Sequence, residues 1–596
     1  MTQMKLKPIV TDTYDFPTLI RDGNVYVDKT AYLHRLVSKV DGTLFFMSRP
    51  RRFGKSLMIS TLEQIFKGNK KLFKGLAISK SNYDWKRHPI IRLDMTAFDH
   101  TSGLALFKRS LATELGGEEP VAAFRALIAK KTRVSQGRGV VVLVDEYDAP
   151  VSGLLGKPKE LAAMREFLQS FYRILKQEAG SIRFLMMTGV SKFTKLSVFS
   201  GLNNLTDLSM RQEYAALLGY TCEELEKDFG RQIDAFAKEK GCSPQEIVRD
   251  LLSWYDSYRF SPKSDIRVCN PVSIGRALIE KSFSNYWEGT GNASLILERL
   301  RAIGKLPDEM NGLRATKAEL DVCDVARLPV KALMYQSGYL TIKEVLADDQ
   351  YVLGVPNKEV SDSLSHGYVS MMFGDKAEDF LPQAFDVRTM LEGDETEGMA
   401  QMLTSVFAMV PHEWKLKTEA EAKRYFLLFM KMAGADITPE LELSKGRADA
   451  IVETEKAVYV FEFKYGKTAK AALRQIAENG YAMPYASDRR KVRCVGLNYN
   501  VKTASFDAPL IAEAINGKVN GKVNGKVNGK VNGKVNGKVN GKVNGWISAH
   551  PGCKRLALIR AVGKSARTVD RALAELIANK VVEFRGAPKT GGYYAC

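Results

Sequence analysis

The first third of the chain alternates short apolar runs with longer amphipathic segments. The runs lie at 43–48, 88–95, 139–147 and 181–189, and the segment after the first run, 56–66, has apolar residues at helical spacing. Near-continuous apolar strands separated by helices predict a parallel sheet that helices cover on both faces.

Two further regions follow with different patterns. Residues 211–345 are mostly helical in pattern. The last part of this region, 333–345, and the segment 351–360 are predicted to form a pair of strands. Helical spacing returns over 396–435. Two apolar runs at 447–454 and 457–464 then predict a hairpin across a polar turn, followed by a helix at 467–486 and a strand at 491–500.

The end of the chain begins with a repeat. From Asn516 to Val543 the sequence is NGKV seven times over. Since Gly and Asn recur every fourth residue, we expect a flexible linker without a core or a regular helix. Beyond it, 554–562 and 565–579 predict two helices, and 581–586 with 591–595 predict a hairpin, which together is the winged-helix arrangement. In the second helix the residues expected to face inward are Val569, Leu573, Leu576 and Ile577.

Composition is that of an ordinary globular protein, with 45% hydrophobic residues. No apolar run approaches the roughly 20 residues needed to span a bilayer, and the first residues lack the apolar core of a signal peptide. The seven cysteines are scattered singly, which excludes a zinc-finger pattern and a disulfide framework. We therefore expect a cytoplasmic protein with no membrane partner.

The net charge of +20 is concentrated at one end. The repeat contributes seven lysines and no acid, and 545–596 holds nine Lys/Arg against three Asp/Glu, so +13 of the +20 lies in the last 81 residues. A basic end on a balanced body favours a nucleic-acid partner, in particular DNA. A solubilising tail is the alternative.

The stretch SRPRRFGKSL, 48–57, places Gly54, Lys55 and Ser56 between a predicted strand and a predicted helix. Backbone N–H groups and the positive end of a helix can hold phosphate there. The P-loop pattern asks for a glycine where Arg49 stands, and we expect Arg49, Arg51 and Arg52 to supply positive charge to phosphate oxygens instead. A second GKS at 563–565 follows a helix and is interpreted as a helix turn.

An acid pair ends the apolar run 139–147. We expect Asp145 to bind Mg²⁺ opposite the hydroxyl of Ser56, and Glu146 to polarise the attacking water. Thr188, at the end of the next run, is placed to sense the γ-phosphate. The alternative is a structural α/β sheet with accidental acids.

Several motifs carry a family resemblance. They are YVDKT (26–30), FFMSRPRRFGKSL (45–57), VDEYDAP (144–150), TGVSKFTKLSVFSGLNNL (188–205), YQSGYLTI (335–342) and VPNKEV (355–360). Over roughly residues 7 to 500 the chain resembles the predicted AAA-ATPase family. The resemblance implies an ATP site, a loop in which Arg49 is a family trait, and a nuclease-like domain that follows the ATPase.

A second candidate site lies in GRADAIVETEKAVYVFEFKYGK, 446–467. The period of two in a strand puts Glu462 and Lys464 on one face, and the hairpin brings Asp449 close. We expect the two carboxylates to bind Mg²⁺, with the Phe463 carbonyl as a third ligand, and Lys464 to orient or activate water for attack on a phosphodiester.

This stretch resembles the PD-(D/E)xK nuclease superfamily, and the resemblance implies that Gln475 is a polar residue beside the site. Either Glu440 or Glu442 is a candidate to complete the metal shell. An inactivated nucleic-acid-binding relative and a half-buried hairpin with surface charges are the alternatives to an active nuclease.

Together these patterns predict an α/β protein: a P-loop ATPase core (1–210), a helical lid (211–345), a connecting region (346–395), a nuclease-like domain (396–505), a linker (506–545) and a winged helix (546–596). The expected function is ATP-regulated, Mg²⁺-dependent cleavage of nucleic acid, in mobile-element or phage defence. An ATP-gated DNA-binding regulator and an interaction scaffold are the rivals, and the oligomeric state is open. The residues expected to contact DNA are Arg567, Thr568, Arg571 and Lys589.

Overall fold

The computed structural model describes residues 6–595 with internal gaps. The gaps are 41, 99–102, 155–156, 193–204, 288–292, 304, 306, 322–328, 374–386, 388, 396–397, 399–417, 433–435, 444–445, 504, 525–536, 563–568, 571, 574–575, 578–580 and 586–591. The chain divides into two compact units, Met1–Val523 and Asn524–Cys596.

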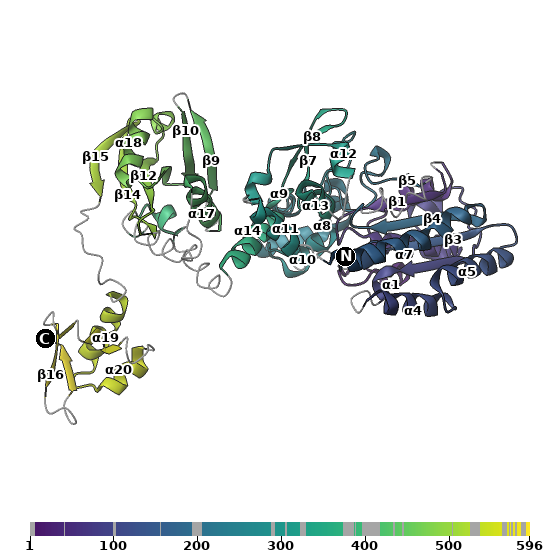
Figure 1. Ribbon diagram of the computed structural model, residues 1–596, viewed down its shortest axis with the longest axis horizontal. Helices are drawn as coiled ribbons and strands as arrows, with labels where there is room; N and C mark the ends of the chain where they lie inside the picture. Colours follow the sequence, from purple (N-terminus) through teal and green to yellow (C-terminus); the bar gives the residue numbers. More distant parts are fainter. Residues whose placement is uncertain are drawn as a thin grey trace, which may run out of the picture. The chain divides into compact units, whose positions relative to one another are not determined.

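Five of the described strands form a sheet near the N-terminus, in which every neighbouring pair is parallel (Figure 1). The strands are β1 (Leu44–Ser48), β2 (Ile90–Asp94), β3 (Val140–Asp145), β4 (Ile182–Gly189) and β5 (Thr206–Asp207), in the order β2-β3-β4-β1-β5. The four predicted apolar strands are confirmed. Because β4 lies between β1 and β3, the carboxyl ends of these three strands meet at one edge, where ligands bind in open α/β sheets.

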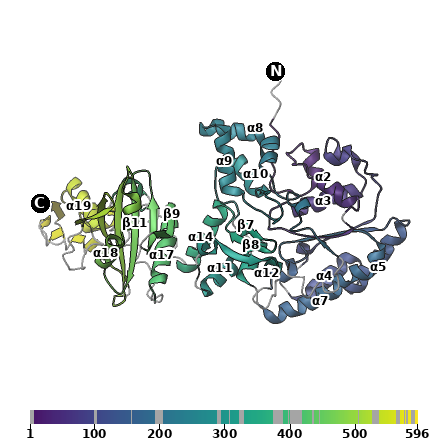
Figure 2. The same cartoon turned by 90° about the horizontal axis from the view of Figure 1, so that it is seen from above.

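Helices cover both faces of this sheet, as the continuous apolar strands predict (Figure 2). On one face lie α2 (Thr30–Val37) and α3 (Lys55–Phe66), and on the other α4 (Leu104–Leu115), α5 (Pro120–Val134) and α7 (Pro158–Gln177). Side chains alternate along a strand. Accordingly Phe45 and Met47 pack with α3, whereas Leu44 and Phe46 pack with the helices of the opposite face.

A mostly helical region, predicted from the sequence to be a lid, follows the sheet. Its helices are α8 (Cys222–Lys240), α9 (Pro244–Tyr255), α10 (Pro271–Glu280), α11 (Ala293–Ala302), α12 (Lys317–Asp321), α13 (Val330–Ser337) and α14 (Lys358–Phe373). Strands β6 (Leu313–Thr316), β7 (Thr341–Ala347) and β8 (Gln350–Gly354) form a small antiparallel sheet. The prediction of a strand from residue 333 is wrong at its start, because α13 extends to Ser337 and ends at a left-handed Gly338.

The nuclease-like region has the order α-β-β-β-α-β. It comprises α17 (Glu419–Met432), β9 (Asp436–Leu443), β10 (Gly446–Glu453), β11 (Ala457–Tyr465), α18 (Ala469–Asn479) and β12 (Lys491–Asn500). The predicted hairpin is confirmed, with Ala450 opposite Phe461, and β12 is parallel to β11. Strands β13 (Ser505–Phe506), β14 (Leu510–Ile515) and β15 (Lys518–Asn524) continue this sheet beyond residue 505, the expected end of the domain.

The expectation that the NGKV repeat has no regular structure is wrong at its two described ends. Residues 518–524 form β15 at the edge of the sheet, and α19 (Gly537–Ala549) begins inside the repeat. Valine at every fourth position puts an apolar side chain on one helix face at each turn, and Val543 is buried in the core of the second unit. This packing outweighs the poor helix propensity of Gly and Asn.

The second unit contains α19, α20 (Arg555–Val562) and an antiparallel hairpin of β16 (Val582–Arg585) and β17 (Gly592–Ala595). Val569, Leu573 and Leu576 are buried as predicted, but Ile577 is 42% exposed, since adjacent helical residues point in different directions. The predicted DNA contacts Arg567, Thr568, Arg571 and Lys589 lie outside the described residues. Across the described chain, no helix has the length and apolarity to cross a membrane.

Candidate functional site

The loop between β1 and α3 encloses a lysine. Gly54 caps α3 with φ 95°, in the left-handed region that favours glycine. The side chain of Lys55 is 3% exposed, and its Nζ donates hydrogen bonds to the carbonyl oxygens of Arg49 (3.0 Å) and Pro50 (3.1 Å). The loop therefore holds the ammonium group inside its own turn.

The acid pair meets this lysine from the end of β3. Asp145 is buried and accepts hydrogen bonds from the hydroxyls of Thr188 and Ser56. Burial raises the pKa of Asp145 above its usual value, although these two hydrogen bonds act in the opposite direction. Glu146 Oε1 lies 3.1 Å from Lys55 Nζ. The structure thus brings together five of the residues that the sequence assigned to the nucleotide site.

Glu146 has an unusual backbone conformation, with φ 47°. A left-handed residue other than glycine is strained, and such strain is often found at functional sites. The donor set beside it also fits Mg²⁺, because the Ser56 hydroxyl and the Asp145 carboxylate are oxygen ligands already in contact with each other.

The three arginines of the loop differ in their surroundings. Arg49 is 2% exposed; it donates to the carbonyl oxygens of Ser209 (2.6 Å) and Ser48 (2.9 Å), and its guanidinium lies 4.1 Å from the centre of the Phe260 ring. Burial lowers the pKa of Arg49 to about 10. The expectation that Arg49 binds phosphate is wrong, because the guanidinium is buried and both Nη atoms donate to carbonyl oxygens inside the protein, with only Nε left without a partner among the described residues.

The other two arginines lie nearer the surface. Arg51 is half-buried. Arg52, also half-buried, has φ 66° and donates from its guanidinium to the carbonyl oxygen of Tyr286 at 2.6 Å. Arg52 therefore joins the loop to the lid region.

A cavity of about 100 Å³ adjoins the loop at Arg52, Phe53 and Gly54. Its other walls come from the segments 9–14, 25–29 and 217–220, from the starts of α3 and α10, and from Leu19, Leu33 and Phe229. Most of the lining side chains are apolar, including Ile9 and Met58. A flat, largely apolar ring of the size of a nucleobase suits such walls, next to a loop that can hold its phosphates.

The second candidate site lies where β10 and β11 pair. The backbone N–H of Phe463 donates to Asp449 Oδ2 at 2.7 Å. Lys464 Nζ donates to Glu462 Oε1 at 2.9 Å and to the carbonyl oxygen of Phe463 at 2.7 Å. The side chains of Asp449, Glu462 and Lys464 are all largely buried and lie together, as the sequence predicted.

Glu462 differs from its two neighbours in its hydrogen bonding. Its Oε2 is buried and has no hydrogen-bond partner among the described residues. Burial, followed by the charge of Asp449, raises the pKa of Glu462 to about 7. An orphaned carboxylate oxygen beside a second carboxylate fits a divalent cation, which Asp449, Glu462 and the Phe463 carbonyl would hold. The described residues contain no group of three or more His, Cys, Asp or Glu suited to a metal.

Helix α17 contributes two residues that the sequence analysis missed. Lys423 Nζ lies 2.5 Å from Asp449 Oδ1, and Glu419 Oε1 lies 4.0 Å from Lys464 Nζ. The periodic stretch 420–432 was the available sign, but its apolar face indicates packing and not chemistry.

The remaining candidates of this site are not joined to it. The Gln475 amide lies 3.5 Å from the Tyr481 hydroxyl, and no interaction of Gln475 with the two carboxylates is recorded in the described structure. The side chains of Glu440 and Glu442 lie outside the described residues.

Comparisons with known proteins agree with this arrangement. A family model described as predicted AAA-ATPase matches residues 10–199, and one described as PD-(D/E)XK nuclease superfamily matches residues 417–507. The chain is also 32% identical over 523 residues to a protein of Azotobacter chroococcum mcd 1, described as an uncharacterized protein in vnfD 5'region, and the match covers 84% of this chain and 97% of that protein. The chain belongs to the predicted AAA-ATPase family and carries a PD-(D/E)XK nuclease superfamily domain after its ATPase region.

Proposed function

We propose that this protein binds and hydrolyses ATP at the carboxyl edge of the parallel sheet. The observation that carries the proposal is the convergence of Lys55, Ser56, Asp145, Glu146 and Thr188 at one point. These residues come from a loop, a helix and two strands, and a structural sheet has no need of two acids, a lysine and two hydroxyls at the same edge.

Each group has a role in phosphoryl transfer to water. Lys55 would contact the β- and γ-phosphates, and Ser56 with Asp145 would hold Mg²⁺, which neutralises charge that develops on the phosphate oxygens. Glu146 would accept the proton of the attacking water. Thr188, which is hydrogen-bonded to Asp145 in this structure, would sense the γ-phosphate. Gly54, Arg51 and Arg52 complete the phosphate-facing loop in this proposal.

The cavity beside the loop is the proposed base site. Its walls include the first turns of α3, so a base in the cavity and phosphates at Gly54–Ser56 lie within the reach of one nucleotide. Apolar walls supply burial for the ring, while the fit of polar groups to its edge sets which base is preferred.

The test is nucleotide binding by two variants. Lys55→Ala should weaken the binding of a fluorescent ATP analogue at least about tenfold, which is about 1.4 kcal/mol, because it removes the cation enclosed in the loop. Lys564→Ala changes the other GKS and is the matched control, with unchanged affinity expected. Equal losses in both variants would refute the assignment.

We propose further that the nuclease-like domain cleaves nucleic acid with Mg²⁺ under the control of the ATPase. Support comes from the orphaned Glu462 Oε2 beside Asp449, with the ammonium group of Lys464 next to both the carboxylate and the Phe463 carbonyl. Lys464 would orient or deprotonate water that attacks a phosphodiester. Defence against mobile elements or phage is proposed from the architecture alone.

A specific contact favours the rival function, an ATP-gated regulator that binds DNA without cutting it. The ammonium of Lys423 is 2.5 Å from the Asp449 oxygen that a metal would need. A cation fixed at that place would exclude the metal ion and leave a nucleic-acid-binding surface without chemistry.

Plasmid nicking separates the two functions. With Mg²⁺ or Mn²⁺, wild type should nick DNA, and Asp449→Asn and Glu462→Gln should lose more than the roughly 10- to 100-fold that is typical of residues behind a metal ligand. Both variants should hydrolyse ATP at the wild-type rate. If wild type retains DNA but cuts no form of DNA or RNA, the regulator is the function.

We also propose that the second unit binds DNA as a winged helix. Support comes from its helices, its hairpin and its charge. Because β15 belongs to the nuclease-like sheet, a truncation should be made after Asn524; it removes five repeat lysines and the net +6 of residues 545–596, a total of +11. Truncation should weaken DNA binding and flatten its salt dependence. Unchanged affinity and slope would indicate a protein-interaction module.

A further inference from the structure

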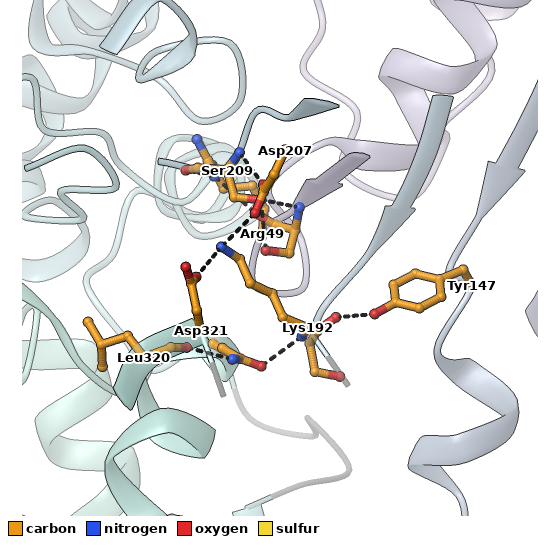
Figure 3. Close-up of polar contacts among 10 residues, drawn as sticks. Arg49, Tyr147, Lys192, Asp207, Ser209, Leu320 and Asp321 are labelled. Carbon is orange, nitrogen blue, oxygen red and sulfur yellow. Dashed lines mark hydrogen bonds and ion pairs between the residues drawn. The ribbon is translucent and has the colours of Figure 1, made fainter. Parts of the chain in front are cut away.

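Three residues beyond the end of β4 lies Lys192, a buried lysine that phosphoryl transfer does not use. Lys192 is 4% exposed, and its Nζ lies 3.0 Å from Asp207 Oδ2 and 2.8 Å from Asp321 Oδ1 (Figure 3). A buried ammonium is costly unless it is paired and hydrogen-bonded. Burial by itself lowers the pKa of Lys192, but Asp207 and Asp321 outweigh it and raise that pKa above its usual value, so the group stays charged.

The two residues before Lys192 are hydrogen-bonded to the segment that carries the proposed catalytic acids. Asp148, the last residue of VDEYD (144–148), accepts hydrogen bonds from the backbone N–H groups of Val190 (3.2 Å) and Ser191 (2.8 Å). The Tyr147 hydroxyl donates to the carbonyl oxygen of Ser191 at 2.6 Å (Figure 3). A Cβ at Gly189 would lie 2.5 Å from Asp148 Oδ1, so the approach of the two segments requires glycine. The ends of β3 and β4 must therefore move together.

On a second side the lysine reaches the phosphate loop. Asp207, in β5 next to β1, accepts a hydrogen bond from the backbone N–H of Ser209 at 2.9 Å. The Ser209 hydroxyl accepts from the backbone N–H of Ser48 at 2.9 Å, and its carbonyl accepts from Arg49 at 2.6 Å. The residue that replaces the usual loop glycine is thus part of the same buried network.

On the third side the network enters the lid. Asp321 is the last residue of α12. The backbone N–H of Lys192 donates to the Gln336 side chain, on α13, at 2.8 Å, and the Gln336 amide donates to the carbonyl oxygen of Leu320 at 2.8 Å (Figure 3). Lys192 is therefore held by α12 and α13 at once.

We propose that Lys192 is a positioning residue that couples the γ-phosphate end of β4 to the lid. A ligand that draws the Thr188 hydroxyl away from Asp145 shifts the end of β4, and Lys192 transmits that shift to α12 and α13 through Asp321 and Gln336. Charged hydrogen bonds in a water-free interior are strong and sensitive to geometry, which makes this connection stiffer than apolar packing. The proposal rests on the proposed ATP site.

Coupling of this kind is reciprocal. If ATP and ADP differ in how strongly they stabilise the contact between Lys192 and the lid, then that contact must change the ratio of the affinities for ATP and ADP by the same factor. The two ion pairs of Lys192 differ in this respect, since Asp207 ties it to the sheet and Asp321 ties it to the lid. Removal of the Asp321 charge should therefore weaken the connection between Lys192 and α12 while the ion pair with Asp207 in the sheet remains.

The experiment is hydrogen exchange of the full chain with Asp321→Asn, in ATP analogue, in ADP and without nucleotide. Wild type should show ATP-dependent protection of α12 and α13. The variant should bind the ATP analogue with an affinity within about threefold of wild type. It should nevertheless lose most of the difference in protection of α12 and α13 between the ATP-analogue and ADP states, a difference expected to be about fivefold or more in wild type. Asp321→Glu keeps the carboxylate and should therefore restore part of the difference in protection between the two nucleotide states.

Asp394→Asn is the matched control. Asp394 is a 7%-exposed carboxylate that pairs with Lys491 and Arg493 in the nuclease-like region, so its loss should leave lid protection unchanged. Wild-type coupling in Asp321→Asn, or an equal loss of protection with and without nucleotide, would overturn the proposal and make the pair merely structural. Absence of analogue binding in wild type would instead refute the ATP site itself.

Discussion

The proposed ATP site and the nuclease-like site contain the same kinds of side chain, a buried lysine beside two carboxylates, but they differ in how fully those side chains are hydrogen-bonded. At the ATP site Lys55 is held by two loop carbonyls and Glu146, and Asp145 by two hydroxyls. At the nuclease-like site one oxygen of Glu462 has no partner among the described residues. The first site is closed by its own hydrogen bonds, whereas the second leaves one carboxylate oxygen without a partner among the described residues.

The two sites also differ in how far apart their parts lie in the chain. Asp449, Glu462 and Lys464 come from a single hairpin. The ATP site draws on the loop after β1 and the ends of β3 and β4, and through Lys192 it is joined to helices beyond residue 316. A site assembled from distant segments can respond to movement of any of them, whereas a hairpin site depends chiefly on what enters it.

The largest expected effect is a loss of ATP hydrolysis that leaves the nuclease-like site unaffected. Glu146→Gln keeps the size of the side chain but cannot accept a proton, so ATP hydrolysis should fall by about 10²- to 10⁴-fold while nucleotide binding remains. Nuclease activity in the absence of ATP should not change. Phosphate release under saturating ATP measures the effect, and Glu160→Gln, at an exposed position of α7, is the control. Hydrolysis at the wild-type rate would remove Glu146 from the mechanism.

The next effect compares two buried carboxylates. Burial raises the pKa of both Glu359 and Glu462 to about 7. Both oxygens of Glu359 accept hydrogen bonds from the Ser273 hydroxyl, and Oε1 also accepts from the backbone N–H of Tyr286. Glu359 is therefore satisfied as an anion, whereas Glu462 is not.

Glu359 makes the stability of the ATPase region depend on pH. A carboxyl whose pKa is higher in the folded state than in the unfolded state binds more protons when folded, so its contribution is complete below about pH 4.5 and declines as pH rises towards about 7. The decline amounts to roughly 3 kcal/mol at most. Glu359→Gln should remove it, and a pH series of thermal unfolding measures the difference in slope. An unchanged slope would show that Glu359 titrates normally.

The same pair should differ at a fixed pH of 8. Glu359→Gln turns an amide NH₂ towards donors and should lower the melting temperature. Glu462→Gln removes a buried charge at an oxygen that lacks a donor, so the melting temperature should stay the same or rise. Equal destabilisation by the two substitutions would mean that both oxygens of Glu462 have hydrogen-bond donors in solution, which would contradict the proposed metal site.

Sequence reasoning succeeded where the signal was local. The apolar runs that became β1, β3 and β4, and the hairpin with Asp449 and Glu462, follow from strand periodicity within a few residues. The Gly54–Ser56 triplet was interpretable because a strand precedes it and a helix follows.

The failures arose where tertiary contacts decide. Arg49 has the charge of a phosphate ligand, but its guanidinium is used by carbonyls more than 150 positions along the chain, among them that of Ser209. The roles of Lys192 and Lys423 depend on partners in distant elements, which no pattern near either lysine indicates. The described ends of the repeat form a strand and the first part of a helix, because neighbouring apolar residues pack against Val519 and Val543.

The smallest effect concerns the cation that the nuclease-like site already has. Lys423 and a divalent ion compete for Asp449 Oδ1, since the other oxygen of Asp449 is used by the Phe463 N–H. Lys423→Met preserves the length and packing of the side chain but removes the charge. Mn²⁺ should therefore bind about tenfold more tightly, a gain of about 1.4 kcal/mol.

Titration of Mn²⁺ by electron paramagnetic resonance, in an Asp145→Asn background that silences the ATP site, measures this affinity without any need for cleavage. Arg424→Met is the control on the same helix, because Arg424 pairs with Glu309 and not with Asp449, and it should leave the affinity unchanged. Weaker binding in Lys423→Met would mean that the ammonium holds Asp449 in the metal-binding position. Tighter binding would mean that the ammonium group occupies the metal position. The two sites would then use lysine differently. At the proposed ATP site lysine and metal would act together on phosphate, whereas at the nuclease-like site Lys423 must leave before the metal can bind.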